Sequence, residues 1–277
     1  MALGKIQEIL LSYYIQHRIF IQLFNMASNF THWSPSDNRA KFLIKECLWI
    51  LWPTFMEARY SIDIYDKIKE KRILFIHIPK TAGISLSEAI YGEQIGHAKW
   101  DVFYRCNPRN YASLTKFAVC RDPIERFISA FNFLKVGGIN NSDRKFSSEV
   151  LERFDSADEF ARSLSSDSMR ARALNKVHFF PQTDFICNVD GIFMVDYILN
   201  LHNLQTDLPR ILGERTPEYI PYKNAGPNSR LKTKQLTRKA SEILEEIYAL
   251  DFKLLRHTLE LHHIFGTHIL SNPRSGL

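Results

Sequence analysis

The feature that most constrains this chain is an apolar run that stops at a proline and a lysine. Residues 73–78 read Ile-Leu-Phe-Ile-His-Ile, and Pro79-Lys80-Thr81-Ala82-Gly83-Ile84-Ser85 follows directly. Such a run is typical of a strand buried on both faces of a parallel sheet. A helical pattern continues over about residues 84–91. The segment therefore predicts a strand, a tight turn and a helix.

Two further apolar segments predict additional strands. Residues 116–120 read Lys-Phe-Ala-Val-Cys, and residues 192–195 read Ile-Phe-Met-Val. The helix predicted after the first of them has apolar residues at helical spacing: Phe127, Ala130, Phe131 and Leu134. Strands that alternate with helices indicate an α/β fold with a mainly parallel sheet. The sequence predicts a P-loop-like α/β domain over residues 71–277, preceded by a helical extension over residues 1–70.

The other segments give simpler patterns. Residues 137–148 begin with Gly-Gly and predict a polar, mobile loop. Residues 150–175 predict helices, and residues 237–263 predict one long amphipathic helix or two. The helices of residues 1–70 either cover the core of the domain or rest an aromatic-rich face on a membrane surface.

The turn after the first strand is suited to bind an anion. The first N–H groups of a helix lack partners and lie at the positive end of its dipole. Gly83 lets the backbone approach a ligand, and Lys80 adds a full positive charge. Thr81 and Ser85 offer hydroxyl donors.

The order of residues in this turn discriminates between ligands. A nucleoside-triphosphatase loop reads GxxxxGK[ST], with a hydroxyl beside the lysine for magnesium. Here Lys80 comes first, behind Pro79, and no glycines precede it. The order disfavours a triphosphate-and-magnesium site. The plainer alternative is a strand-to-helix turn with an incidental lysine.

A second anion site is predicted where the second strand ends, because ligands gather at the carboxyl ends of strands in an open α/β sheet. Arg121 leaves the strand there, and Ser129 lies on the helix that follows. The two side chains can converge on one phosphate. Asp122 is interpreted as a structural residue of the turn before Pro123, and Arg126 as a capping or ion-pair residue.

The two motifs together are recognisable. Residues 75–83, Phe-Ile-His-Ile-Pro-Lys-Thr-Ala-Gly, and residues 121–129, Arg-Asp-Pro-Ile-Glu-Arg-Phe-Ile-Ser, resemble the carbohydrate sulfotransferase family. This family includes the heparan-sulfate 2-O- and 6-O-sulfotransferases and bacterial relatives, and the resemblance covers about residues 72–256. It implies a 3′-phosphoadenosine 5′-phosphosulfate (PAPS) donor and no metal.

The resemblance also implies site residues. The 5′-phosphosulfate would be held by Lys80, Thr81, Ala82, Gly83, Ile84 and Ser85, and the 3′-phosphate by Arg121 and Ser129. Ile84 departs from the family pattern, which usually has threonine there. One side-chain donor to the phosphate is therefore missing, although the backbone N–H remains.

Sulfuryl transfer to a hydroxyl needs a base near the acceptor oxygen and a cation near the leaving phosphate. Among ten histidines, His97 lies in a Gly-His-Ala-Lys-Trp segment that resembles the family's catalytic histidine segment. We therefore predict His97 as the base and Lys80 as the cation; the alternative for His97 is a loop histidine packed on Trp100. His178 and Gln182, in a segment similar to a family segment near the cleft, are predicted to orient the acceptor.

Residues 223–239 contain six basic residues and no acid, so the charge of this one stretch equals the net charge of the whole chain, +6. It forms either a solvated basic face or part of the nucleotide site. The four cysteines have no zinc or CxxC spacing, which favours a reducing compartment without disulfides.

Several function classes remain open. The expected acceptor is a carbohydrate hydroxyl on a polysaccharide or glycolipid, and no nucleic-acid partner is expected. The expected location is the bacterial cytoplasm, where the first helix would be the part that touches the inner membrane face, because no segment reads as a signal peptide or transmembrane helix. The alternatives are a nucleotide kinase with an atypical loop and a non-catalytic nucleotide- or glycan-binding relative.

Overall fold

The computed structural model describes residues 62–220, 236–256 and 270–271. The chain divides into two compact units, Met1–Met56 and Glu57–Leu277, and all described residues belong to the second. The helices expected before residue 62, and most of the basic stretch of residues 223–239, lie outside the described residues. The domain boundary expected at residue 70 stays a prediction.

The centre of the described region is a four-stranded sheet in the order β1-β2-β3-β4. Its strands are β1 (Ile73–Ile76), β2 (Thr115–Cys120), β3 (Tyr197–Asn200) and β4 (Leu270–Ser271). β1 pairs with β2 and β2 with β3 in parallel, in a register that places Phe75 beside Phe117 and Phe117 beside Tyr197. β4 adds to β3 antiparallel. The expected α/β class is confirmed by this small parallel sheet and its helices.

The third predicted strand was placed wrongly. Strand β3 begins at Tyr197, whereas residues 192–195 contribute only an isolated antiparallel bridge between Phe193 and Cys187. The N–H of Met194 donates to the carbonyl of Ile186, not to a strand. The apolar run is buried only in its second half, where Met194 and Val195 are 8% and 1% exposed, while Ile192 is 51% exposed. Burial by itself does not decide which segment pairs with the sheet.

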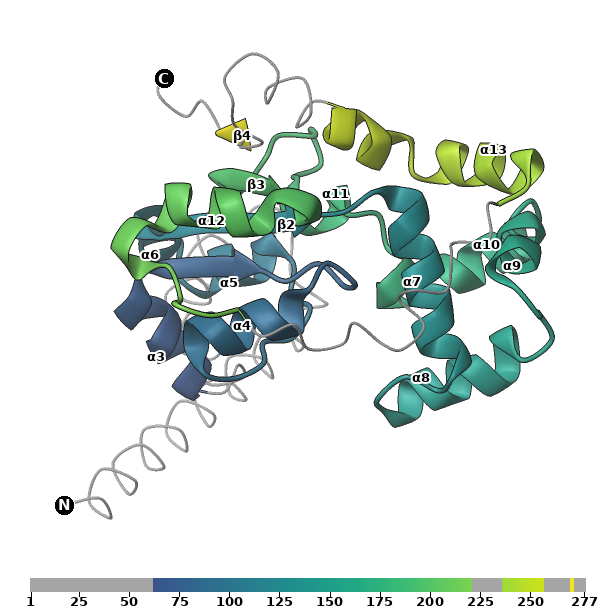
Figure 1. The fold of residues 1–277 in the computed structure, drawn as a ribbon, viewed down its shortest axis with the longest axis horizontal. Helices are drawn as coiled ribbons and strands as arrows, with labels where there is room; N and C mark the ends of the chain where they lie inside the picture. The colour runs from purple at the N-terminus through teal and green to yellow at the C-terminus, as the bar shows by residue number, and fades with distance from the viewer. Residues whose placement is uncertain (1–61, 221–235, 257–269, 272–277) are drawn as a thin grey trace, which may run out of the picture. The chain divides into compact units, whose positions relative to one another are not determined.

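Helices surround the sheet and continue beyond it (Figure 1). Those before the second strand and directly after the third are α3 (Ile62–Lys71), α4 (Gly83–Tyr91), α5 (Trp100–Cys106), α6 (Pro108–Ser113) and α12 (Leu204–Leu212). A second group of helices lies on the right-hand side of Figure 1, away from the sheet. It consists of α7 (Pro123–Lys135), α8 (Asn141–Phe146), α9 (Ala157–Ser163), α10 (Asp167–Leu174) and α13 (Arg238–Ile247), and the π-helical turn η2 (Ser147–Leu151) follows α8. Short connecting elements are the 3₁₀ turns η3 (Val177–Phe179), η4 (Leu201–Asn203) and η5 (Gly213–Arg215) and helix α11 (Thr183–Ile186).

Residues 137–148 are not the loop that their composition suggested. Helix α8 begins after Asn140, whose side chain caps it by accepting from the N–H of Asp143. Asp143 is buried, and a Cβ on Gly138 would lie 2.4 Å from the Cβ of Asp143. Gly138 permits this close approach because it has no Cβ, and both Gly137 and Gly138 take positive φ angles that favour glycine.

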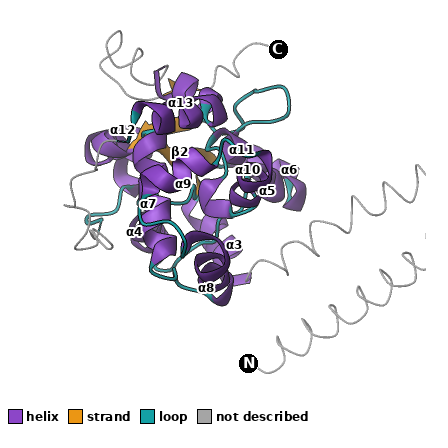
Figure 2. Cartoon of the chain, turned by 90° about the vertical axis from the view of Figure 1, so that its right-hand side faces the viewer, coloured by secondary structure: helices purple, strands orange, loops and turns teal. Residues whose placement is uncertain are grey.

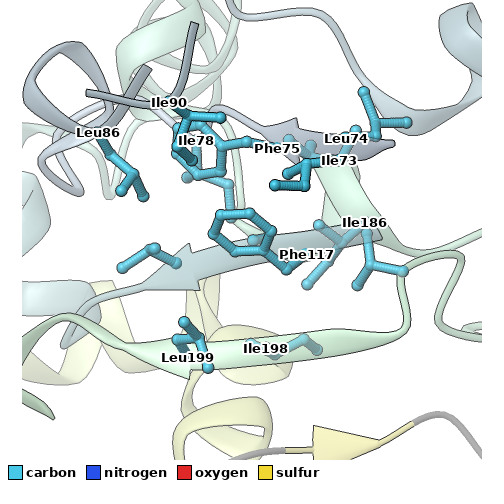
Figure 3. Close-up of a cluster of buried hydrophobic side chains, with 14 of the residues drawn as sticks. Ile73, Leu74, Phe75, Ile78, Leu86, Ile90, Phe117, Ile186, Ile198 and Leu199 are labelled. Carbon is cyan, nitrogen blue, oxygen red and sulfur yellow. The ribbon is translucent and has the colours of Figure 1, made fainter. Parts of the chain in front are cut away.

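The buried side chains form two separate clusters. The sheet core is built from the strands and from α4, with Phe75 and Phe117 stacked at 5.1 Å between ring centroids (Figure 3). The helical core is built from α7, α9 and α13, with Phe160 in contact with Phe127 and Phe179. Figure 2 looks onto the helical side, with the strands behind α7 and α9.

Candidate active site

The loop between β1 and α4 has a strained backbone. Lys80 and Ala82 take positive φ angles of 71° and 62°, which non-glycine residues rarely adopt. Ala82 is the N-cap of α4 and offers no side-chain cap. The N–H of Leu86 donates back to the carbonyl of Ala82 at 3.1 Å. Such strain is found where a loop must hold its backbone open to a ligand.

The two hydroxyl residues of this loop are both buried. Thr81 is fully buried, and its hydroxyl donates to the carbonyl of Ile78 at 2.9 Å. A hydroxyl has one proton, so in this arrangement Thr81 can reach an anion only through its backbone N–H. Ser85 is 3% exposed on the first turn of α4.

Gly83 has a packing role that the sequence did not reveal. A Cβ at this position would lie 1.8 Å from Cδ2 and 2.0 Å from Nε2 of His77. Gly83 is therefore required to admit the His77 ring, in addition to any close approach to a ligand.

Lys80 is the one loop cation, and its ammonium lies 4.1 Å from the centre of the Phe133 ring on α7. The residues that the structure describes give it no hydrogen bond and no carboxylate partner. Burial lowers the pKa of Lys80 to about 8, and the positive charge of Arg121 contributes to the shift. A buried cation held against an aromatic face is suited to receive an anion.

His97 lies next to this loop. Its Nδ1 is 3.2 Å from the backbone carbonyl of His77, and the two rings are 4.2 Å apart at their centroids. Because a carbonyl only accepts, Nδ1 carries the proton and Nε2 keeps its lone pair. Burial lowers the pKa of His97, and Lys80 adds to the effect. The ring is therefore a neutral base at pH 7.

His178 on η3 extends this group. Its ring is 5.8 Å from that of His97 and 5.1 Å from that of Phe133. Burial lowers the pKa of His178 to about 4, against the opposing charge of Asp143. Its Nδ1 is buried, and the described residues provide no hydrogen-bond partner for it.

Gln182 is 1% exposed and holds the end of β2. Its side-chain oxygen accepts from the N–H of Arg121 at 2.9 Å, and its amide donates to the carbonyl of Arg121 at 2.9 Å. Both ends of the side chain are used in this way. These contacts place Gln182 against the backbone of Arg121, which it fixes; its role in orienting the acceptor stays a prediction.

Arg121 and Ser129 are not in direct contact. The Nε of Arg121 donates to Glu125 at 3.2 Å, one turn into α7. Ser129 follows Glu125 by four residues and so shares its helix face. A phosphate between Arg121 and Ser129 would therefore lie close to the Glu125 carboxylate. The prediction from the sequence considered only Arg121 and Ser129 at this site and did not include this negative charge. Asp122 caps α7 by accepting from the N–H of Glu125 at 2.9 Å, as expected.

Arg126 is a buried structural cation. It donates to the carbonyls of His178 at 3.1 Å and Phe180 at 2.6 Å. Asp251 lies 3.9 Å from it and accepts from the N–H groups of Gln182 and Thr183. Together they fix the segment that carries both His178 and Gln182.

The structure thus brings Lys80, His97 and His178 together, with Arg121 near enough to affect the charge of Lys80. Sequence reasoning missed Phe133 and Asp143. Phe133 falls outside the apolar positions predicted for α7. An aromatic residue that does not belong to the core face of its helix could have been recognised from the sequence as a candidate site residue. Nothing in the sequence distinguished Asp143 from the other acids.

Asp143 forms a buried ion pair with Lys176, with Nζ and Oδ1 2.7 Å apart. Burial opposes the ionisation of Asp143, but hydrogen bonds from Lys176 and from the N–H of Ile139 outweigh it and lower the pKa. The carboxylate therefore stays charged beside His178. It partly offsets the positive charges in this part of the site.

Comparison with known proteins gives a family. A sequence model of the sulfotransferase family matches residues 65–257, more than half of the chain. The chain therefore belongs to the sulfotransferase family, as its two motifs predicted, and the family supports sulfuryl transfer and a hydroxyl-bearing acceptor. Searches of curated proteins and of solved structures gave no match.

Within residues 62–220, 236–256 and 270–271, the helices and the possible metal ligands are as follows. None of the helices described there is long and apolar enough to cross a bilayer. The same residues contain no group of three or more histidine, cysteine or acidic side chains arranged to hold a metal ion. The described cysteines Cys106, Cys120 and Cys187 are free thiols.

Proposed function

We propose that this protein transfers a sulfuryl group from PAPS to a hydroxyl of a carbohydrate, with His97 as the base. The observation that carries the proposal is the pairing of a cation without a described counterion and a neutral base. Lys80 stands just before the N-terminus of α4, and His97, a half-buried ring with a basic Nε2, lies beside the same loop.

The loop fits the 5′-phosphosulfate of the donor. The N-terminus of α4 provides backbone N–H groups and the positive end of the helix dipole. Lys80 adds a charge without breaking an existing ion pair. The P-loop-like character of the fold is part of this proposal, with backbone N–H groups in place of the missing side-chain hydroxyl at Ile84.

The 3′-phosphate would bind at the end of β2, where Arg121 already has the Glu125 carboxylate as a partner. Only the Nε of Arg121 is engaged by Glu125, so the Nη atoms of the guanidinium remain for a phosphate. Ser129 offers a hydroxyl on the same face of α7. A phosphate there would compete with Glu125 for Arg121.

When bound, PAPS supplies a sulfuryl group whose bond to phosphate breaks as the acceptor oxygen bonds to sulfur. In this mechanism Nε2 of His97 takes the proton of the acceptor hydroxyl. Lys80 stabilises the charge that develops on the leaving phosphate oxygen. Holding both groups in place accounts for most of the rate, as in phosphoryl transfer.

His178 lies beside His97 and is the residue proposed to orient the acceptor. A cytoplasmic location also stays a proposal.

Binding measurements test the donor site. Adenosine 3′,5′-bisphosphate should bind by calorimetry, and Lys80→Ala and Arg121→Ala should each weaken it about 10- to 100-fold, as for hydrogen bonds to charged groups. Matched controls are Lys71→Ala and Arg105→Ala, whose side chains are 48% and 62% exposed on other helices. Unchanged affinity in both site variants would overturn the donor-site assignment.

A transfer assay tests the reaction. Radiolabelled PAPS should pass its label to a polysaccharide or glycolipid in a panel that also includes a tyrosine peptide and a simple alcohol. Tighter binding of ATP with magnesium than of the bisphosphate would favour a kinase. Bisphosphate binding without transfer to any acceptor would favour a non-catalytic nucleotide-binding protein.

A further inference from the structure

The ring of His77 contacts both parts of the candidate site. It lies at the end of β1, is 4% exposed, and packs so closely on Gly83 that a Cβ there would be 1.8 Å from Cδ2. On its other side its ring centroid is 4.2 Å from that of His97. One imidazole therefore separates the first residue of α4 from the base.

Two hydrogen bonds connect His77 to the segment of the base. The Nδ1 of His77 is 3.0 Å from the carbonyl of Ile95, and the carbonyl of His77 is 3.2 Å from Nδ1 of His97. Each carbonyl can only accept, so both histidines carry their proton on Nδ1. The segment 95–97 is thus fixed at both ends by His77, the residue that follows β1.

We propose that His77 is a positioning residue for the base. Its Nδ1–H holds Ile95, and its ring supports His97, so that Nδ1 of His97 meets the carbonyl of His77 and Nε2 is the basic nitrogen. This inference rests on the proposed role of His97. His77 itself does not contact substrate in this scheme.

A histidine suits this position because it donates at Nδ1 and stays neutral. Burial lowers the pKa of His77 to about 3, with His97 adding to the shift. The other ionisable groups that act on His97 are Lys80 on the β1–α4 loop, His178 on η3 and Asp143 on α8. These groups are unchanged in the variants that follow.

Two amide substitutions of His77 distinguish the contribution of its Nδ1–H donor from that of its ring. In His77→Asn the amide nitrogen is as many bonds from the backbone as Nδ1, so the bond to Ile95 can form. In His77→Gln the nitrogen corresponds to Nε2, so that bond is lost. We expect His77→Asn to keep kcat within about threefold, and His77→Gln to lose at least about tenfold, part of the usual contribution of a general base.

Two other measurements separate positioning from general damage. The affinity for adenosine 3′,5′-bisphosphate should change less than about threefold in both variants, because Lys80 and Arg121 remain. Nitrogen-15 histidine spectra should show His97 as the neutral Nδ1–H tautomer in the wild type and in His77→Asn, but as a tautomer mixture in His77→Gln. The acid limb of the kcat profile should move to higher pH in His77→Gln, because a loosened ring is less buried.

The outcomes are decisive. Wild-type kcat and tautomer in His77→Gln, or equal losses in the two variants, would overturn the positioning role. So would failure of both variants to fold, which would make the ring a general structural element. If the wild type transferred no sulfuryl group, the proposed function would fail, while the spectra would still decide what His77 does to His97.

Discussion

The sheet core and the helical core of residues 62–256 bury charge in different ways. Near the sheet, Lys80 and His97 lie at the end of β1 and have no carboxylate in hydrogen-bond contact among the described residues. In the helical core, Arg126 meets two carbonyls and Asp251, and Lys135 donates to the carbonyls of Leu151, Glu152 and Phe154. Arg126 and Asp251 are each 1% exposed, whereas Lys80 and His97 are half-buried, so the two regions differ both in how deeply they place these groups and in the partners they give them.

The difference follows from where strands and helices end. The carboxyl ends of parallel strands meet at one edge of a sheet, so polar residues there face a common ligand position. In the helical part, the charged side chains complete the hydrogen bonds of helix ends and turns, since buried polar groups require partners. We therefore expect changes near the sheet edge to affect activity and changes in the helical core to affect stability.

The largest effect is expected for His97→Ala. Removing the base should lower kcat by about 100- to 10,000-fold, the usual contribution of general acid–base catalysis. The affinity for adenosine 3′,5′-bisphosphate and the unfolding midpoint should change little, because the ring is at the sheet edge and outside both cores. Near-normal turnover in this variant would show that another group is the base.

Phe160→Ala tests the helical core. Phe160 is fully buried against Phe127 and Phe179, and its truncation should cost about 3–5 kcal/mol of unfolding free energy. The folded fraction should retain its turnover per molecule. Leu250→Ala is the matched control, since Leu250 is 64% exposed and should change stability by less than about 0.5 kcal/mol. A specific loss of turnover in folded Phe160→Ala would break the division between the two cores.

Gln182→Leu tests the connection between the regions. Loss of both bonds to the Arg121 backbone leaves a buried donor and acceptor unpaired, at a cost of about 1–3 kcal/mol. Because Arg121 is then less well fixed, bisphosphate affinity should also fall. Gln205→Leu, at an exposed position of α12, should change neither. If Gln182→Leu left both quantities intact, Arg121 would be positioned by other contacts.

The remaining prediction is a dependence of stability on pH. Burial lowers the pKa of His77 to about 3 and of His178 to about 4, from an ordinary value of 6.5. Below that value the unfolded chain binds protons that the folded protein excludes, so the unfolding free energy should fall between about pH 7 and about pH 5. Urea titrations measure it, and His77→Asn should show a shallower fall. Equal stability across this range would mean that the rings are not held neutral.

The sequence predicted much of the fold and only part of the site. The segments that became β1 and β2 each hold four consecutive apolar residues, 73–76 and 117–120, as expected for strands buried on both faces of a parallel sheet. The run at residues 192–195 was equally apolar but hydrogen-bonds to Ile186, because strand pairing depends on neighbours far along the chain. Lys80, His97 and Arg121 were named from motifs, whereas Phe133 and Asp143 lie on helices whose approach to the loop no local pattern specifies.

By itself, the sequence determined that a strand leads through a lysine and a glycine into a helix, and the family match agrees with the chemistry inferred from that order. Local order suffices there because a turn and a helix N-terminus are made by neighbouring residues. Only the tertiary structure decided that Gly83 admits the His77 ring and that Gln182 supports Arg121. Those contacts join residues that are distant along the chain, and packing, which no periodicity records, brings them together.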